Sequence, residues 1–141
     1  MLFRSPHSAI ESAVSGLRRA GQQDDLPRGL LTRAWLRSLT GARIGAESAQ
    51  SDLDEAWEIA ERGTMRLHLA DIHLSRARLF GLRMVDGGFL IDGLRIEEPY
   101  PPYPWKESAE ADLAAAEKLI AECGYHRRDE ELADARKAIL G

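Results

Sequence analysis

Apolar residues recur at spacings of three and four through most of the chain, which is the pattern of amphipathic helices. The stripe of the first predicted helix consists of Ile10, Val14 and Leu17. Ser8 and Glu11 fit a capping box, in which a hydroxyl and a carboxylate each accept a hydrogen bond from a free backbone amide. This helix is therefore expected to begin at Ser8 and to end before Gly21, which suits a left-handed stop.

A second helix is expected to follow almost at once. Asp24 or Asp25 can cap it, and Pro27 falls in its first turn, where a missing backbone amide costs nothing. It extends to Gly41, and its apolar positions are Leu30, Leu31, Ala34, Trp35 and Leu39.

Two more helices are predicted before residue 81. The third runs from about Ala46 to Arg62, with one face formed by Ala49, Leu53, Ala56, Trp57 and Ala60. Thr64 is expected to cap the fourth, from about Met65 to Phe80, which is apolar on more than one side. Such a helix usually lies between others. The connections are short, so neighbouring helices are expected to run antiparallel.

The helical period disappears between Gly81 and Pro104. Asp86, Gly87 and Gly88 would suit the turn of a small β-hairpin. The segment ends in alternating prolines and aromatic residues, which favour extended backbone: Pro99, Tyr100, Pro101, Pro102, Tyr103, Pro104 and Trp105. An irregular insertion as long as 82–104 is unusual inside a compact domain.

Helical periodicity returns at about Lys106. The fifth predicted helix has a face made of Ala109, Leu113, Ala116, Ile120 and Cys123, and Gly124 stops it. A last helix begins at Arg128 or Asp129 and reaches Leu140, with Leu132, Ala135 and Ile139 facing inward. About six helices in all predict the all-α class.

Two stretches of the chain echo each other. The stretch 52–63 resembles 112–124, and the helix after each contains the triplet Leu-Ala-Asp, at 69–71 and at 132–134. An internal echo of this kind is typical of helical repeats. The chain resembles a tetratricopeptide-repeat (TPR) protein, and the residues that carry the resemblance are Ala34, Ala49, Leu53 and Ala56.

The resemblance implies antiparallel helical hairpins of a short TPR-like superhelix, forming a single domain over 1–141 with the insertion 82–104 inside the second hairpin. A closer resemblance is to the C-terminal repeat region of large bacterial TPR proteins, some of which carry an NTPase module upstream. The stretches 26–31 and 122–132 carry it. The sequence contains no Gly-Lys-Ser/Thr phosphate loop, so no NTPase activity is implied.

The net charge narrows the class of partner, and the cysteine count bears on the cellular compartment. The formal net charge of −4 gives no general attraction to nucleic acid or to an anionic membrane, so neither partner is expected. The single cysteine, Cys123, cannot form a disulfide bond within the chain, and nothing indicates an oxidising compartment. We therefore expect a cytoplasmic protein.

The sequence offers little catalytic chemistry. His68, Asp71 and His73 are close on one predicted helix, but His73 is five residues from His68, and zinc ligands on a helix favour a spacing of four. Cys123 lies on an apolar face without an activating histidine, as expected of an inert thiol. We therefore predict no catalytic residue, no metal site and no cofactor.

The resemblance implies a protein or peptide partner, which would bind along the first helices of successive hairpins. The residues predicted to contact it there are Trp35, His68, Asp71 and Arg78. Tyr100, Tyr103 and Trp105 are either a second docking element or side chains that pack back over the helices; aromatic residues and arginine are favoured at interfaces.

Two alternatives to an interaction module stay open at this point. In the first, the chain assembles with itself, either through the first predicted helix, whose apolar flank would be left uncovered, or through the 82–104 insertion. In the second, it is a subunit of a larger TPR-containing NTPase-type signalling protein. A small enzyme or metal protein is the third reading.

Overall fold

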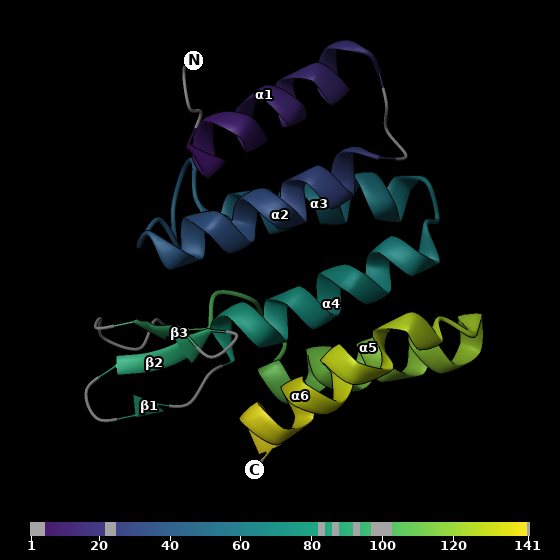
Figure 1. Ribbon diagram of the computed structural model, residues 1–141. Helices are drawn as coiled ribbons and strands as arrows, with labels where there is room; N and C mark the ends of the chain where they lie inside the picture. The colour runs from purple at the N-terminus through teal and green to yellow at the C-terminus, as the bar shows by residue number, and fades with distance from the viewer. Residues whose placement is uncertain are drawn as a thin grey trace. The chain divides into compact units, whose positions relative to one another are not determined.

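The computed structural model describes residues 5–21, 25–81, 84–85, 88–91, 94–96 and 103–140. Helices carry the fold of these residues (Figure 1), which confirms the predicted all-α class. They are α1 (Pro6–Arg19), α2 (Leu26–Leu39), α3 (Ala49–Arg62), α4 (Arg66–Phe80), α5 (Ala109–Cys123), the 3-10 helix η1 (His126–Arg128) and α6 (Asp129–Leu140). Among the helices described, none is long and apolar enough to cross a membrane.

The chain divides into two compact units. The first unit is Met1–Thr64 and contains α1, α2 and α3; the second unit is Met65–Gly141 and contains α4, α5 and α6. The single domain expected over 1–141 stays a prediction.

The predicted start of the first helix is wrong. The N-cap is Ser5, whose hydroxyl accepts a hydrogen bond from the amide of Ser8, and α1 begins at Pro6. Proline is well suited to the first turn because its missing amide needs no partner there. Ser8 thus lies inside the helix. The carboxylate of Glu11, which was predicted to complete the capping box, instead binds Arg33 and Arg37 of α2.

Serine side chains also set the starts of α3 and α5, each three residues later than predicted. The hydroxyl of Ser48 accepts from the amide of Ser51, and that of Ser108 accepts from the amide of Ala111. Thr64 does not cap α4, contrary to prediction. The N-cap is Met65, which makes no side-chain capping bond.

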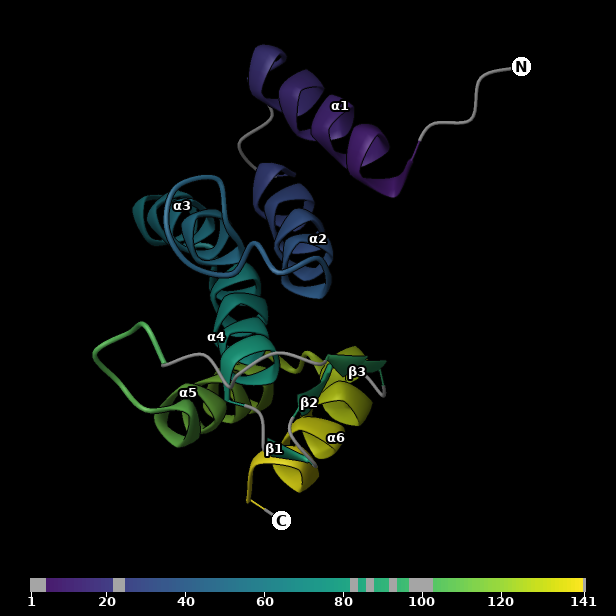
Figure 2. The same cartoon turned by 90° about the vertical axis from the view of Figure 1, so that its left-hand side faces the viewer.

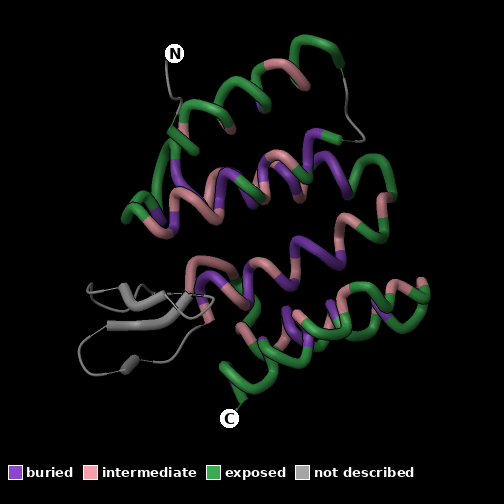
Figure 3. Tube along the Cα trace, viewed as in Figure 1, coloured by how far each residue is buried: buried purple, intermediate pink, exposed green. Residues whose placement is uncertain are grey.

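In the first unit, α2 contacts both α1 and α3, and the chain reverses direction at each connection (Figures 1 and 2). Four of the five apolar positions predicted for α3 are buried, namely Ala49, Leu53, Ala56 and Ala60. Of the five predicted for α2, Leu30 and Ala34 are buried and the other three are half-buried. The structure describes all of α1, and Val14 is its one buried residue (Figure 3). Gly29 of α2 leaves room for it, because a Cβ there would lie 3.2 Å from Leu17 and 3.5 Å from Val14.

In the second unit, α5 packs along α4, and α6 contacts both of them. The core contains Ala70, Leu74 and Ala77 of α4. It also contains six of the eight inward positions predicted for the last two helices: Leu113, Ala116 and Ile120 of α5, and Leu132, Ala135 and Ile139 of α6. The spacing of three and four places these residues on one face of each helix.

Within the insertion 82–104 the described residues form three short strands, β1 (Met84–Val85), β2 (Gly88–Ile91) and β3 (Leu94–Ile96). They form an antiparallel sheet in the order β1-β2-β3, with Met84 opposite Phe89 and Leu90 opposite Arg95. This is a meander of three strands, where the sequence suggested a two-stranded hairpin.

Gly81 allows α5 to approach the end of α4. A Cβ at this position would lie 2.5 Å from the Cβ of Ala109 and 2.7 Å from the carbonyl oxygen of Ala77, closer than atoms can pack. We expect Gly81→Ala to lower the free energy of unfolding by about 1–3 kcal/mol, because part of the α4–α5 contact must move apart. Urea denaturation followed by circular dichroism measures this change.

Gly16 offers the matched control for Gly81. It lies inside α1, and a Cβ there would meet nothing within 4 Å. Gly16→Ala should therefore raise the free energy of unfolding by about 0.5–1 kcal/mol through helix propensity alone. Equal stability of Gly81→Ala and the unchanged protein would contradict the close approach of α4 and α5.

Candidate functional site

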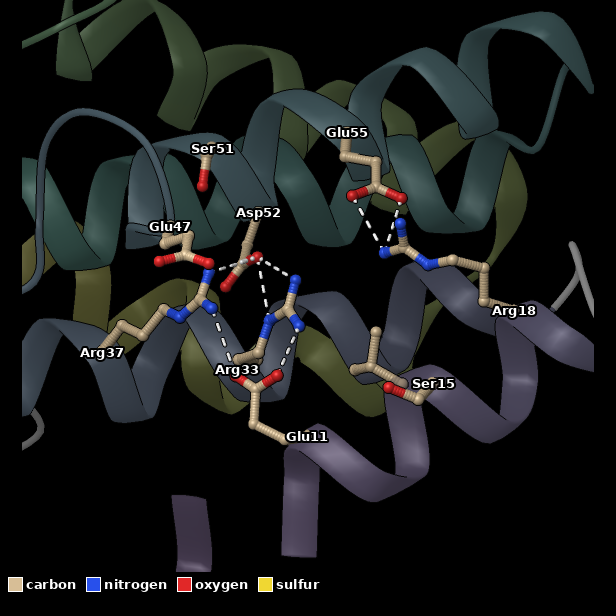
Figure 4. A pocket seen from close by; sticks show the side chains of 10 residues that line it. Glu11, Ser15, Arg18, Arg33, Arg37, Glu47, Ser51, Asp52 and Glu55 are labelled. Atoms are coloured by element: carbon tan, nitrogen blue, oxygen red, sulfur yellow. Dashed lines mark hydrogen bonds and ion pairs between the residues drawn. The ribbon is translucent and has the colours of Figure 1, made fainter. Parts of the chain in front are cut away.

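A cavity of about 430 Å³ opens between the three helices of the first unit (Figure 4). Apart from Val14, its walls are charged or carry hydroxyl groups. We call it the charged cavity; it is lined by Glu11, Ser15 and Arg18 from α1, Arg33 and Arg37 from α2, and Glu47, Ser51, Asp52 and Glu55 from α3 and the turn before it.

Asp52 lies at the centre of the wall formed by α3. Its Oδ1 accepts hydrogen bonds from Arg33 Nε at 3.0 Å, from Arg33 Nη2 at 2.7 Å and from Arg37 Nη1 at 3.0 Å. Arg33 and Arg37 are four residues apart on α2, so they lie on the same face and both reach this one carboxylate.

Glu11 of α1 binds the other ends of the two guanidinium groups. Arg33 Nη1 donates to Glu11 Oε2 at 3.2 Å, and Arg37 Nη2 donates to Glu11 Oε1 at 3.1 Å. Asp52, Arg33, Glu11 and Arg37 therefore form a closed ion-pair ring that links all three helices (Figure 4). Two positive and two negative groups make this ring neutral.

A second ion pair connects α1 directly to α3. Arg18 Nη2 lies 3.1 Å from Glu55 Oε1 and 2.9 Å from Glu55 Oε2. The side chain of Arg18 is about half exposed, so this pair is expected to contribute little to stability on its own. With the ring, it fixes the positions of the charged groups around the cavity.

Burial sets the electrostatics of the ring. Asp52 is 1% exposed and Arg33 is 9% exposed. Burial raises the pKa of Asp52 above its ordinary value, and the hydrogen bond and charge of Arg33 offset part of that rise. Burial is the largest single effect on Arg33 and lowers its pKa, but the hydrogen bond and charge of Asp52, together with the charges of Glu11 and Glu55, outweigh it and leave the pKa raised. Both groups are costly to bury and depend on each other.

A second polar cluster surrounds Asp112 in the second unit. Asp112 is 1% exposed; the Tyr103 hydroxyl donates to its Oδ2, and His73 Nδ1 lies 2.7 Å from its Oδ1. Arg76 Nη1 is 3.8 Å from the same Oδ1. Burial, followed by the hydrogen bond to Asp112, raises the pKa of Tyr103. The cluster ties the start of α5 to α4 and to the chain before α5.

Trp105 packs beside this cluster. Its ring lies edge-on to Phe80, with centroids 5.0 Å apart, and to Tyr103, with centroids 5.3 Å apart. The guanidinium of Arg76 lies 4.8 Å from the centre of the Trp105 ring, within range of a cation–π contact. Tyr103 and Trp105 thus pack back on residues of α4 and α5, the second of the two readings allowed by the sequence.

Asp71 of α4 joins the helix to the turn between α5 and α6. Its Oδ2 accepts from the Tyr125 hydroxyl at 3.1 Å, and its Oδ1 accepts from Arg128 Nε at 2.9 Å. Burial is the largest single effect on Arg128 and lowers its pKa, but the hydrogen bond and charge of Asp71, together with Tyr125, outweigh it and raise the pKa. Asp71 is itself buried, so its carboxylate is engaged inside the unit.

The residues predicted to contact a partner are divided between the two units. Trp35 belongs to the first unit, whereas His68, Asp71, Arg78, Tyr103 and Trp105 belong to the second. Trp35, His68 and Arg78 are half-buried, and each interacts within the chain. Tyr100 lies outside the described residues. Their predicted role in partner binding stays a prediction.

Sequence reasoning missed the charged cavity. The spacing of Arg33 and Arg37 was a usable signal, since two arginines four apart lie on one helix face. Their carboxylate partners come from two other helices, 15 and 22 or more residues away, and no local pattern identifies them. Glu11 was moreover interpreted as part of a capping box.

Comparisons with known proteins leave the geometry as the main guide to function. The chain matches no family model, no curated protein and no solved structure. Within the described ranges, no three histidine, cysteine, aspartate or glutamate side chains are grouped to hold a metal ion. The resemblance to TPR proteins stays a prediction.

Proposed function

We propose that the protein is a protein-interaction module that binds a protein or peptide partner at the charged cavity and catalyses no reaction itself. The cavity is the observation that carries this proposal. It is open, it has the volume of a ligand site, and its polar groups come from three different helices. Arginine, which supplies three of the residues that line the cavity, is enriched at protein interfaces.

The ion-pair ring supports the proposal in a second way. Because Arg33 and Arg37 are held at both ends by Asp52 and Glu11, their side chains are already ordered. A partner that binds beside them loses less conformational entropy than one that must order free arginine side chains.

The fold proposed for this module is a TPR-like hairpin formed by α2 and α3. Supporting it, the small and apolar residues that carry the resemblance are all fully buried between helices that run antiparallel: Ala34, Ala49, Leu53 and Ala56. We place the protein in the cytoplasm, because its single cysteine is free.

Affinity capture from the source cell, read by mass spectrometry, tests the proposal. Glu47 is exposed at the cavity wall, and among the described residues it makes no ion pair, so Glu47→Lys changes the cavity without breaking the ring. We expect this variant to recover the partner about 3- to 10-fold less well than the unchanged protein. Glu61→Lys, at another exposed glutamate outside the cavity, is the matched control. Equal recovery by all three proteins would refute the proposal.

Self-assembly is the second candidate, favoured by α1. Only Val14 of this helix is buried, while the neighbouring apolar residues Ile10 and Leu17 are half-buried. A second copy of the chain would cover them. Light scattering at several protein concentrations distinguishes the candidates, since a strict monomer removes self-assembly.

A further inference from the structure

We infer that the charged cavity receives a basic side chain of the partner, an arginine guanidinium or a lysine ammonium group. This inference rests on the proposed function and assigns the chemistry of its ligand. It follows from the charges of the cavity, from one buried carboxylate oxygen that has no hydrogen-bond partner among the described residues, and from the ion pairs already made by each arginine that lines the cavity.

The charged groups of the cavity do not balance. Four carboxylates line it but only three guanidinium groups, which leaves a net charge of −1. The ion-pair ring and the pair formed by Arg18 and Glu55 are each neutral. The excess charge therefore resides on Glu47, which has no ion-pair partner among the described residues.

Asp52 supplies an acceptor that no described group satisfies. Its Oδ1 accepts three hydrogen bonds from Arg33 and Arg37, whereas its Oδ2 is buried and has no hydrogen-bond partner within the described part of the chain. Figure 4 shows this carboxylate directed into the space enclosed by the ring residues. A buried acceptor of this kind requires an N–H or O–H donor.

A cationic group can pair with the charge of Glu47 and donate a hydrogen bond to Asp52 Oδ2, whereas an anion can do neither. An incoming carboxylate finds Arg18, Arg33 and Arg37 already bound to carboxylates, so it would have to displace Glu11 or Glu55. A neutral amide can donate to Asp52 Oδ2 but leaves the charge of Glu47 unpaired. A guanidinium or ammonium group supplies the donors and the positive charge together.

Titration of the full chain with N-acetyl-arginine amide, followed by NMR, tests the inference. We expect saturable shifts of the backbone amides at positions 47–55 and of the Arg33 Nε–H, with a dissociation constant of about 1–10 mM for this single side chain. N-acetyl-lysine amide should bind at the same residues. N-acetyl-glutamine amide and N-acetyl-glutamate amide, which lack the positive charge, should bind more weakly or not at all.

Charge-neutral variants locate the effect. Asp52→Asn weakens the ring and is expected to destabilise the first unit, so Glu47→Gln carries the test. We expect it to weaken binding of the arginine probe about 3-fold, whereas Glu61→Gln, the matched control outside the cavity, leaves binding unchanged. An unchanged NMR spectrum of each free variant outside the substituted residue confirms that the fold is kept.

The possible failures are distinguishable. Absence of a saturable shift in the unchanged protein, or stronger binding of the glutamate probe at the same amides, overturns the inference. Capture of a partner by a protein that ignores the arginine probe would overturn the inference and leave the proposed function standing. Binding of the arginine probe at 47–55 without any captured partner would support the site and count against the proposed function.

Discussion

Asp52→Ala is expected to lower the free energy of unfolding by about 3–5 kcal/mol. The substitution removes the carboxylate that accepts three hydrogen bonds from Arg33 and Arg37, and it leaves Arg33, only 9% exposed, without its buried partner. Glu11 alone, with a side chain that is 50% exposed, compensates little of this loss.

Urea denaturation followed by circular dichroism measures the effect, and Glu47→Ala is the matched control. Glu47 lines the same cavity but is exposed and outside the ring, so its removal should change the free energy of unfolding by less than about 0.5 kcal/mol. If Asp52→Ala were no more destabilising than Glu47→Ala, the ion-pair ring could not be what joins the helices of the first unit.

Asp112→Ala should lower the free energy of unfolding by about 3 kcal/mol. The buried carboxylate accepts from Tyr103 and lies 2.7 Å from His73 Nδ1, and its loss removes the acceptor of the Tyr103 hydroxyl and this contact with His73. Trp105, which packs on Tyr103 and Phe80, should become more exposed as a consequence.

The same denaturation experiment measures this variant, with tryptophan fluorescence as a second signal. Glu110→Ala is the matched control, since Glu110 is an exposed acidic residue in the first turn of the same helix. Only its favourable position at the helix N-terminus is lost, which costs about 0.3–1 kcal/mol. Similar losses for both variants would show that Asp112 acts through the helix dipole and not through its buried partners.

The helical faces of this protein were predictable from the sequence. Leu113, Ala116 and Ile120 are buried in α5, and Leu132, Ala135 and Ile139 in α6, as their spacing predicts. These predictions succeed because a helix repeats every 3.6 residues, so the position of an apolar residue along the chain determines its direction.

Helix starts were less predictable, because several polar residues near each start are chemically able to cap it. Ser5 and Ser8 are both good N-cap residues, and only the conformation of the chain decides between them. At α4 the hydroxyl of Thr64 was available, yet Met65 precedes the helix and Thr64 has a φ of 52°. Local sequence therefore indicates that a helix begins without identifying its first residue.

The charged cavity was not predictable from local patterns. Arg33, Asp52 and Glu11 each look like an ordinary residue of a solvated helix face, where charged side chains are expected. Their role arises only when α1, α2 and α3 pack and bring them within hydrogen-bonding distance. Tyr103 and Trp105, by contrast, stand out in the sequence because they belong to a run of prolines and aromatic residues. The helix residues that they contact could not be predicted.

Mapping the captured partner on the chain by NMR is the most direct test of the central claim, that the charged cavity is where this protein binds its partner. Addition of the purified partner should shift the amide signals of residues 11–18 and 47–55, the segments that contribute the α1 and α3 walls of the cavity. Shifts confined to residues of the second unit, with these segments unchanged, would contradict it.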